Sequence, residues 1–317
     1  MSAVAVQSGT GYQLPFTDTL GFCNVLFSAL GGDGANNAAK LLFKLGVEIY
    51  DLNGGYDAKY GSEKKGTATD VSIRFCPREV PVRAAGPATN PHVLLIFHER
   101  LIAPLELWRG FQPGGVAIVN TTSSPEQVRA KLRLPAGTVV CVDATTIAAE
   151  TGSRLNMPMM AACANALGFD IEEVKKKIAK RWPRAAESNI AAFDRAVGHA
   201  SKAAFAADDK YQAVAWTKPT GQIGYLNMLN GGAIDALHHN TLGRDNSISG
   251  QGRVPAFDPG NCINCGICMT TCADPGAIIW KDGKMVGIDP CYCKGCMRCV
   301  ALCPVTAKKL KALTFIE

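Results

Sequence analysis

The stretch CYCKGCMRCVALCP, residues 291–304, places five cysteines within fourteen residues. Four of them follow the spacing Cys-x2-Cys-x2-Cys-x3-Cys, and the same spacing occurs 31 positions earlier in CINCGICMTTC. We call residues 262–272 the first run and residues 293–303 the second run. Because no secretory signal is evident, cysteines at this density indicate metal or redox chemistry rather than disulfide bonds. The other four cysteines lack ligand-like spacing and are predicted to be buried thiols: Cys23, Cys76, Cys141 and Cys163.

Thiolates are the usual ligands of iron–sulfur clusters. A run of this spacing gives three ligands to one 4Fe–4S cube, while its fourth cysteine serves the other cube. Cluster one is therefore assigned to Cys262, Cys265, Cys268 and Cys303, and cluster two to Cys293, Cys296, Cys299 and Cys272. Cys291, in register with Gly260, is left as the spare cysteine. Zinc sites also use Cys-x2-Cys pairs, but two interlocked runs favour cubes. Residues 260–317 thus resemble a bacterial two-cluster ferredoxin, a small α+β domain that carries single electrons.

The preceding part of the chain alternates apolar runs with helical patterns. Four runs are nearly continuous, as in strands buried on both faces: FCNVLFSAL (22–30), HVLLIFHE (92–99), GGVAIVNTT (114–122) and TVVCVDAT (138–145). Helical patterns lie between and after them, and one is predicted to begin at Asp170 with a capping box to Glu173. Residues 1–206 are therefore predicted to form an α/β domain with a mostly parallel sheet and flanking helices.

Residues 207–259 are rich in Gly, Asn, Asp and Pro and have weak periodicity, which predicts an extended connector between the two domains. His238 and His239 lie there and are expected to be surface or packing residues. The net charge of +6 comes from scattered basic residues, so no nucleic-acid partner is expected. Apolar runs stay shorter than about 18 residues, so we expect no membrane span and a cytoplasmic location.

The stretch LGGDGANNAAKLL, residues 30–42, follows a predicted strand and opens a helix, as a dinucleotide fingerprint does. The third glycine of that fingerprint is Asn37 here, and Asp33 would place a carboxylate beside a pyrophosphate. A tight turn that lets strand and helix pack closely is the favoured interpretation. The letters GDG and NN also occur in thiamine sites, but here they lie too close together. A flavin- or nicotinamide-dependent reductase remains one alternative.

Six segments in order resemble the gamma domain of the 2-oxoacid:ferredoxin oxidoreductases, the pyruvate:ferredoxin oxidoreductase group. The resemblance covers roughly residues 22–200, and GIDPCYCKGCMRCVALCPVTAKK resembles the second half of the family's delta component. The chain therefore resembles a gamma domain fused to a two-cluster ferredoxin domain. The six segments are LGGDGANNAAKLL, GYDAKYGSEKKGTATDVSIR, GGVAIVNTT, DATTIAAETG, NMPMMAACANALG and ESNIAAFDRAV.

This resemblance implies partners and cofactors that lie outside the chain. Alpha- and beta-type subunits would hold thiamine diphosphate with magnesium, together with a further 4Fe–4S cluster, and would cleave the substrate. This chain would be the electron-transfer subunit, with no catalytic residues of its own. It would relay single electrons through two 4Fe–4S clusters to an external ferredoxin in the cytoplasm of an anaerobe. Basic residues near the clusters are expected to attract that ferredoxin: Lys294, Arg298, Lys308, Lys309 and Lys311.

Where the family has a Pro-Glu-Arg-Arg-Gly segment, this chain has GSEKKG, residues 61–66, which implies altered contacts with coenzyme A. With its fused layout, the chain most resembles a subunit of oxalate oxidoreductase, which cleaves oxalate without coenzyme A. The candidate residues facing the active site are Gly31, Gly32, Gly34, Tyr60, Lys64 and Lys65. Two further alternatives stay open: a pyruvate:ferredoxin oxidoreductase subunit that uses coenzyme A, and a stand-alone ferredoxin-like carrier with an α/β docking domain. The substrate, the use of coenzyme A, the cluster potentials and the stoichiometry are left open by the sequence.

Overall fold

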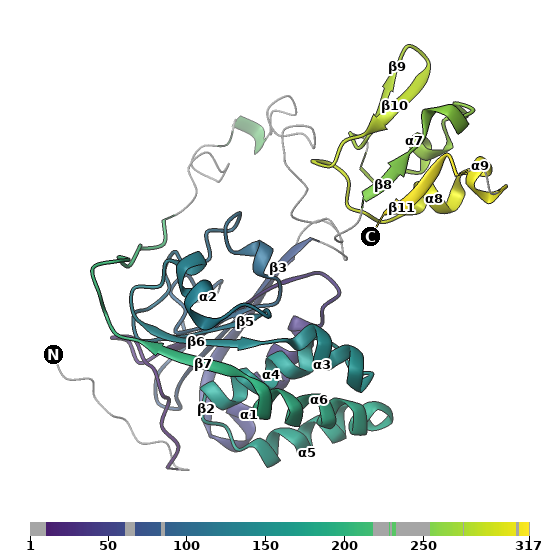
Figure 1. Ribbon diagram of the computed structural model, residues 1–317. Helices are drawn as coiled ribbons and strands as arrows, with labels where there is room; N and C mark the ends of the chain where they lie inside the picture. Colours follow the sequence, from purple (N-terminus) through teal and green to yellow (C-terminus); the bar gives the residue numbers. More distant parts are fainter. Residues whose placement is uncertain are drawn as a thin grey trace. The chain divides into compact units, whose positions relative to one another are not determined.

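The computed structural model describes residues 11–60, 67–83, 86–217, 228, 230–232, 254–274, 276–308 and 311–316. The chain divides between Thr217 and Lys218 into two compact units, and each unit has a hydrophobic core of its own. Figure 1 labels the helices and strands of both units. Among the described residues, we find no helix with the length and apolarity needed to cross a membrane.

The first unit is built on a seven-stranded sheet in the order β2-β3-β1-β4-β5-β6-β7. The four central strands, β1, β4, β5 and β6, run parallel to one another, while β2, β3 and β7 pair antiparallel at the sides. Each parallel strand coincides with one of the four apolar runs, so the predicted mostly parallel α/β sheet is confirmed. The strands are β1 (Cys23–Leu30), β2 (Leu52–Lys59), β3 (Ala68–Pro77), β4 (Val93–Ile96), β5 (Val116–Asn120), β6 (Gly137–Val142) and β7 (Ser201–Phe205).

Six helices cover this sheet. In Figure 1, α2 lies on one face of the sheet, and the other five helices gather on the opposite face. The helix α4 is the most buried of them, because its apolar and small side chains are enclosed on nearly every side. The helices are α1 (Ala35–Ile49), α2 (Pro125–Leu132), α3 (Ala144–Thr151), α4 (Asn156–Ala166), α5 (Ile171–Arg181) and α6 (Ala186–His199). Short 3-10 turns occupy Glu99–Leu101, Pro183–Ala185, Asn230–Gly232 and Pro259–Asn261.

The predicted start of α5 at Asp170 is confirmed, but its cap differs from the predicted box. The Asp170 carboxylate accepts hydrogen bonds from the backbone N–H groups of Glu172 and Glu173, at 2.8 and 3.3 Å. The backbone N–H of Asp170 donates to the Tyr50 hydroxyl at 2.5 Å, and the Glu173 carboxylate pairs with Lys176. A tertiary contact thus takes the place of the local reciprocal bond.

The end of the first unit includes part of the predicted connector. The Arg129 guanidinium binds Asp208 at 2.7 Å and stacks over the rings of Phe205 and Tyr211. The backbone of Val214 forms an isolated parallel β-bridge with that of Arg109. Residues 207–217 therefore pack on the first unit, and the boundaries at 206 and 259 stay predictions. His238 and His239 lie outside the described residues.

The second unit combines short strands with short helices, as expected of a small ferredoxin-like domain. Strand β8 pairs with β11 and strand β9 pairs with β10, both antiparallel. The helices α7 and α8 each follow a Cys-x2-Cys-x2 segment, and α8 lies 31 positions after α7. The elements are β8 (Val254–Phe257), α7 (Ile267–Thr271), β9 (Ile278–Lys281), β10 (Lys284–Ile288), α8 (Arg298–Leu302), α9 (Pro304–Ala307) and β11 (Leu313–Ile316).

Candidate metal centres

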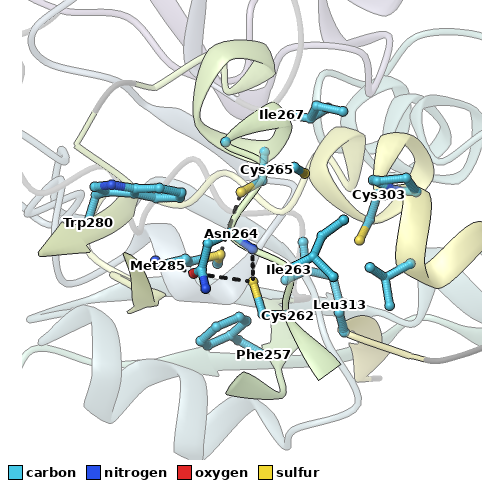
Figure 2. Close-up of a pocket in the computed structure, with 15 residues that line it drawn as sticks. Phe257, Cys262, Ile263, Asn264, Cys265, Ile267, Trp280, Met285, Cys303 and Leu313 are labelled. Atoms are coloured by element: carbon cyan, nitrogen blue, oxygen red, sulfur yellow. Dashed lines mark hydrogen bonds between the residues drawn. The ribbon is translucent and has the colours of Figure 1, made fainter. Parts of the chain in front are cut away.

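One cavity of the second unit collects four cysteines from both runs. We call it the first cavity, and Figure 2 shows Cys262, Cys265 and Cys303 on its walls with apolar side chains between them. Cys268, at the start of α7, completes the set. The space not filled by protein atoms is about 360 Å³, part of it open to solvent. The structure thus brings together the four cysteines assigned to cluster one.

A second cavity collects the other four. Its walls carry Cys293, Cys296 and Cys299 from the second run and Cys272 from the end of the first, around a space of about 360 Å³. The fourth cysteine of each run therefore lies in the cavity formed mainly by the other run, as the spacing predicts. Their role as cluster ligands stays a prediction, although the donor set suits it, because a 4Fe–4S cube takes four thiolates.

The backbone of the two runs repeats as the sequence does. Asn264 and Gly266 have left-handed φ angles of 54° and 77°, and Gly295 and Met297, each 31 positions later, have 66° and 59°. These turns aim backbone N–H groups at sulfur. The Asn264 N–H donates to Cys262 Sγ, and the Gly295 N–H donates to Cys293 Sγ, both at 3.4 Å. Successive N–H groups in such a conformation form concave sites for anions, including iron–sulfur clusters.

Burial disfavours the charged form of several of these thiols. It raises the pKa of the Cys299 thiol to about 11, and it also raises the pKa values of Cys268, Cys272 and Cys293. Burial also opposes ionisation of Cys303, but hydrogen bonds from Thr306 and Val305 together outweigh it, so the pKa of Cys303 is lowered. A metal bound to such sulfur displaces its proton outright, so the donor set remains suited to iron.

Cys291 lies outside both cavities and is exposed to solvent. Its backbone N–H donates to Asp289 Oδ1 at 2.8 Å, and the N–H of Gly260 donates to Asp258 Oδ1 at the same distance. The internal repeat thus extends upstream of the cysteine runs, and Cys291 occupies a turn position that glycine fills in the first half.

The four scattered cysteines are buried in the first unit, which confirms their prediction as buried thiols. Cys23, Cys76 and Cys163 are 0% exposed, and Cys141 is 3% exposed. Burial raises the pKa of Cys76 and of Cys141 to about 11.

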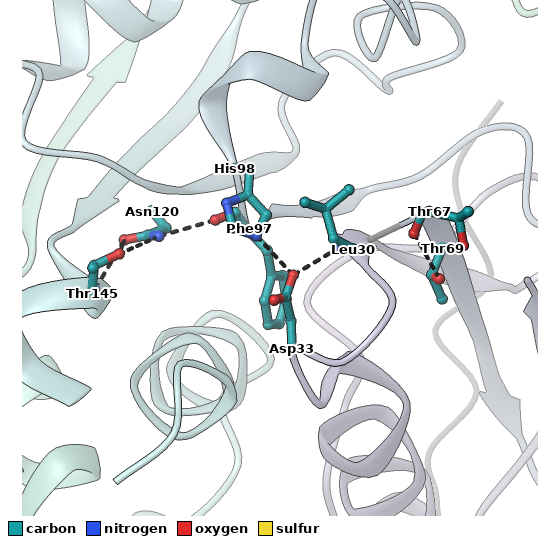
Figure 3. Close-up of polar contacts among 8 residues, drawn as sticks. All are labelled: Leu30, Asp33, Thr67, Thr69, Phe97, His98, Asn120 and Thr145. Carbon is teal, nitrogen blue, oxygen red and sulfur yellow. Dashed lines mark hydrogen bonds and ion pairs between the residues drawn. The ribbon is translucent and has the colours of Figure 1, made fainter. Parts of the chain in front are cut away.

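The glycine turn of residues 31–34 connects the carboxyl end of β1 to the start of α1 (Figure 3). Gly32 and Gly34 have φ angles of 110° and 84°, a region that favours glycine. Between them, Asp33 accepts a hydrogen bond from the Leu30 N–H at 2.8 Å, and its Oδ2 lies 2.8 Å from His98 Nε2. The turn therefore holds strand and helix together and also orients a histidine.

This carboxylate–histidine pair lies where the chain changes direction across the sheet. From β1 the chain moves outward to β2, and from β4 it moves outward the other way to β5 and β6. Open α/β sheets bind ligands at the carboxyl ends of strands at such a switch point. Asn120, at the end of β5, bonds to the Phe97 carbonyl and to Thr145 Oγ1, both at 3.0 Å (Figure 3). Polar side chains thus lie in a row along the edge where the parallel strands have their carboxyl ends.

Tyr60 lies at the same edge of the sheet, directly after the end of β2. The Tyr60 side chain is 56% exposed, and its hydroxyl accepts a hydrogen bond from Asn36 in the first turn of α1. Tyr56 donates to the same Asn36 side chain. Lys64 and Lys65 lie outside the described residues.

Sequence reasoning missed His98 and Asn120. Each lies at the end of an apolar run that predicts a strand, in FHE (97–99) and VNTT (119–122). A polar residue at the carboxyl end of a parallel strand was the available signal.

Gly34→Ala is expected to destabilise the first unit more than Gly152→Ala. Both glycines are left-handed, with φ of 84° and 66°, so each substitution costs about 1–2 kcal/mol of backbone strain. A Cβ at Gly34 would also lie 2.9 Å from Asn156 Cγ, whereas a Cβ at Gly152 meets nothing within 4 Å. Urea unfolding of the two variants measures the difference, and adding Asn156→Ala to Gly34→Ala should recover it. Equal losses would contradict the contact.

Comparisons with known proteins agree with this fold. The family model described as pyruvate ferredoxin/flavodoxin oxidoreductase matches residues 24–198, more than half of the chain. The pyruvate:ferredoxin oxidoreductase of Moorella thermoacetica is 26% identical over an alignment 349 positions long. The alignment covers 92% of this chain but only 29% of that enzyme. The common gamma subunit of the pyruvate/ketoisovalerate oxidoreductases of Pyrococcus abyssi is 32% identical, over 49% of this chain and 83% of that subunit.

One solved structure shares the fold of the first unit. The pyruvate oxidoreductase subunit PORC of Thermotoga maritima is 24% identical, with a TM-score of 0.50 over 57% of this chain and 98% of that chain. The fold, the matched segment and the ordered sequence motifs agree with one another. The chain belongs to the pyruvate ferredoxin/flavodoxin oxidoreductase family.

Proposed function

We propose that this chain is the electron-transfer subunit of a thiamine diphosphate-dependent 2-oxoacid or oxalate:ferredoxin oxidoreductase. In this proposal it carries two 4Fe–4S clusters in a ferredoxin domain fused to the gamma-type α/β domain. The observation that carries the proposal is the arrangement of eight cysteines in two cavities, each with three thiols from one run and one from the other. The match of residues 24–198 supplies the enzyme class.

The chain's own contribution to the reaction is to hold and insulate redox centres. When bound, each 4Fe–4S cluster accepts and releases one electron at a time. Apolar side chains, among them Phe257, Trp280 and Leu313, separate the thiols of the first cavity and limit the access of water (Figure 2). Backbone N–H groups of Asn264 and Gly295 bind sulfur and stabilise negative charge there. The cysteines and these amides thus form a relay that needs no acid or base.

The α/β unit is proposed to cover an active site on alpha- and beta-type partner subunits. Thiamine diphosphate with magnesium there would supply the electron sink that breaking a carbon–carbon bond requires. The turn at Gly31–Gly34, the Asp33–His98 pair and Tyr60 occupy one edge of the sheet, where such folds bind ligands. Gly31, Gly32, Gly34, Tyr60, Lys64 and Lys65 remain the candidate residues facing that site.

The electrons are proposed to leave for an external ferredoxin. Three of the five basic residues expected to attract it are exposed on the second unit, namely Arg298, Lys308 and Lys311. Lys294 is not, because only 10% of its side chain is accessible and it binds Asp274. Lys309 lies outside the described residues. Lys294 is therefore left out of the proposed docking surface, and the other three carry that hypothesis.

Oxalate is the proposed substrate, and pyruvate with coenzyme A is the second candidate. The departure GSEKKG from the family's arginine-containing segment favours oxalate, while the relatives named above act on pyruvate or ketoisovalerate. An anaerobic assay of the native complex with each substrate, with and without coenzyme A, tests this choice. Ferredoxin reduction by oxalate alone supports the proposal. Reduction only by pyruvate with coenzyme A would replace it with the second candidate.

Purified alone, the chain is expected to pass electrons but to convert no substrate. The reason is that simple side chains offer no sink for the carbanion left when a bond next to a carboxylate breaks. A low-potential chemical reductant should bleach the cluster absorption, and added ferredoxin should restore it. Oxalate and pyruvate should leave the spectrum unchanged. Cluster reduction by either substrate in the isolated, thiamine-free chain would overturn this division of roles.

A further inference from the structure

A buried ion pair lies in the wall of the second cavity. Lys294 Nζ is 2.9 Å from Asp274 Oδ1, and the two side chains are only 10% and 8% exposed. Both residues line the cavity that holds Cys272, Cys293, Cys296 and Cys299. Charges this well removed from water are costly, and they persist only when they are paired.

The pair connects the two segments that bring the cysteines together. Lys294 directly follows Cys293 in the second run, and Asp274 follows Cys272, the cysteine that crosses over from the first run. Lys294 and Asp274 therefore approach each other only because the second cavity draws on both runs.

The first cavity has no equivalent. The positions 31 residues away from Lys294 and Asp274 are Ile263 and Val305, both apolar and both in the wall of the first cavity. Among the described residues that line the first cavity, none carries a charge apart from the cysteine thiols once they bind metal. The two cavities, otherwise related by the repeat, differ in electrostatic environment.

Building on the proposed cluster assignment, we infer that the Lys294–Asp274 pair tunes the reduction potential of the second cluster and not of the first. Adding an electron makes a cluster more negative. A nearby ammonium therefore stabilises the reduced form, and a nearby carboxylate destabilises it, with little screening away from water. The pair thus places one of two centres, which have the same kind of ligands and the same backbone geometry, in a different electrostatic field, so that their potentials differ.

The test replaces each member of the pair separately in the full chain. Lys294→Met should lower the potential of one cluster, and Asp274→Asn should raise the potential of the same cluster. The double variant, which removes the whole pair, should leave that cluster at a potential different from that of the wild type, because the two charges do not act equally on it, and the other cluster should not move in any of the variants. Anaerobic redox titrations followed by EPR measure both potentials. Lys281→Met, which removes an exposed lysine from β9, is the matched control and should leave both unchanged.

The outcomes separate this inference from the proposed function. A wild-type chain that binds no iron–sulfur clusters would overturn the proposed function. Two clusters whose potentials stay unchanged, or shift in the same direction, in both single variants would overturn only the tuning role. If the single variants lose one cluster, the cluster potentials of Lys294→Arg and of the double variant distinguish a tuning role from a structural one. If both variants retain the cluster at the wild-type potential, the pair has a purely structural role, and this outcome would also overturn the inference.

Discussion

Replacing Cys303 with alanine is expected to remove one of the two proposed clusters, lowering the iron content from about eight to about four atoms per chain. Although Cys303 belongs to the second run, it lies in the cavity of Cys262, Cys265 and Cys268. The lost cluster should therefore be the one held mainly by the first run. Iron and sulfide analysis of anaerobically reconstituted protein, together with EPR of the reduced state, measures this loss.

Double variants show which cavity Cys303 serves. Cys303→Ala combined with Cys265→Ala should lose no more iron than either change alone, because both act on one cluster. Cys303→Ala combined with Cys296→Ala should lose nearly all of it. Cys291→Ala is the matched control and should retain about eight iron atoms, because Cys291 lines neither cavity. The reverse pattern in the double variants would show that the assignment of ligands to clusters is wrong.

Phe75→Ala is expected to lower the free energy of unfolding of the first unit by about 3–5 kcal/mol, a large part of a typical domain's stability. Phe75 is 0% exposed, and its ring lies 5.9 Å from that of Phe43 and 6.0 Å from that of Phe169. Its edge also fills the space left by Gly46, where an added Cβ would lie 2.3 Å from Phe75 Cε1. Circular dichroism during urea unfolding measures the change.

Two further variants test the cause of this loss. Gly46→Ala alone should destabilise the unit by about 1–3 kcal/mol through overpacking, and by less in a Phe75→Leu background, where the ring is gone. Leu20→Ala, at a side chain that is 71% exposed, serves as the control and should change little. Additive losses for Gly46→Ala and Phe75→Leu would show that the two positions do not compete for the same space.

The sequence predicted the parts of the fold whose signal is local. The four parallel strands are buried on both faces, so their residues are apolar almost without interruption. Strands β2, β3 and β7 were missed. LNGGYDAK and SKAAF are half-buried or exposed and carry no such run, and polar residues interrupt the apolar ones in ATDVSIRFCP. They pair antiparallel at the two sides of the parallel strands, so their position depends on the neighbouring strand.

The candidate sites also differ in whether their signal in the sequence is local. Cysteine spacing is a local signal, and the spacing alone groups the residues of each cavity correctly. The Asp33–His98 contact depends on β4 lying beside β1, which is a property of the whole sheet. Lys294 was expected at the surface because lysine usually is. Its burial depends on Asp274, which lies two residues after the end of the first run.

The exchange of strands in the second unit has a consequence for how such a domain can be assembled. The strand that precedes the first run, β8, pairs with the strand that ends the second half, and the two inner strands, β9 and β10, pair with each other. A polypeptide with only one half would have to dimerise before either cavity had its fourth cysteine. Joining the halves in one chain turns that encounter into an intramolecular step, with an effective concentration in the millimolar range for a short link. Completion of the two cysteine sets then no longer depends on how much protein the cell contains.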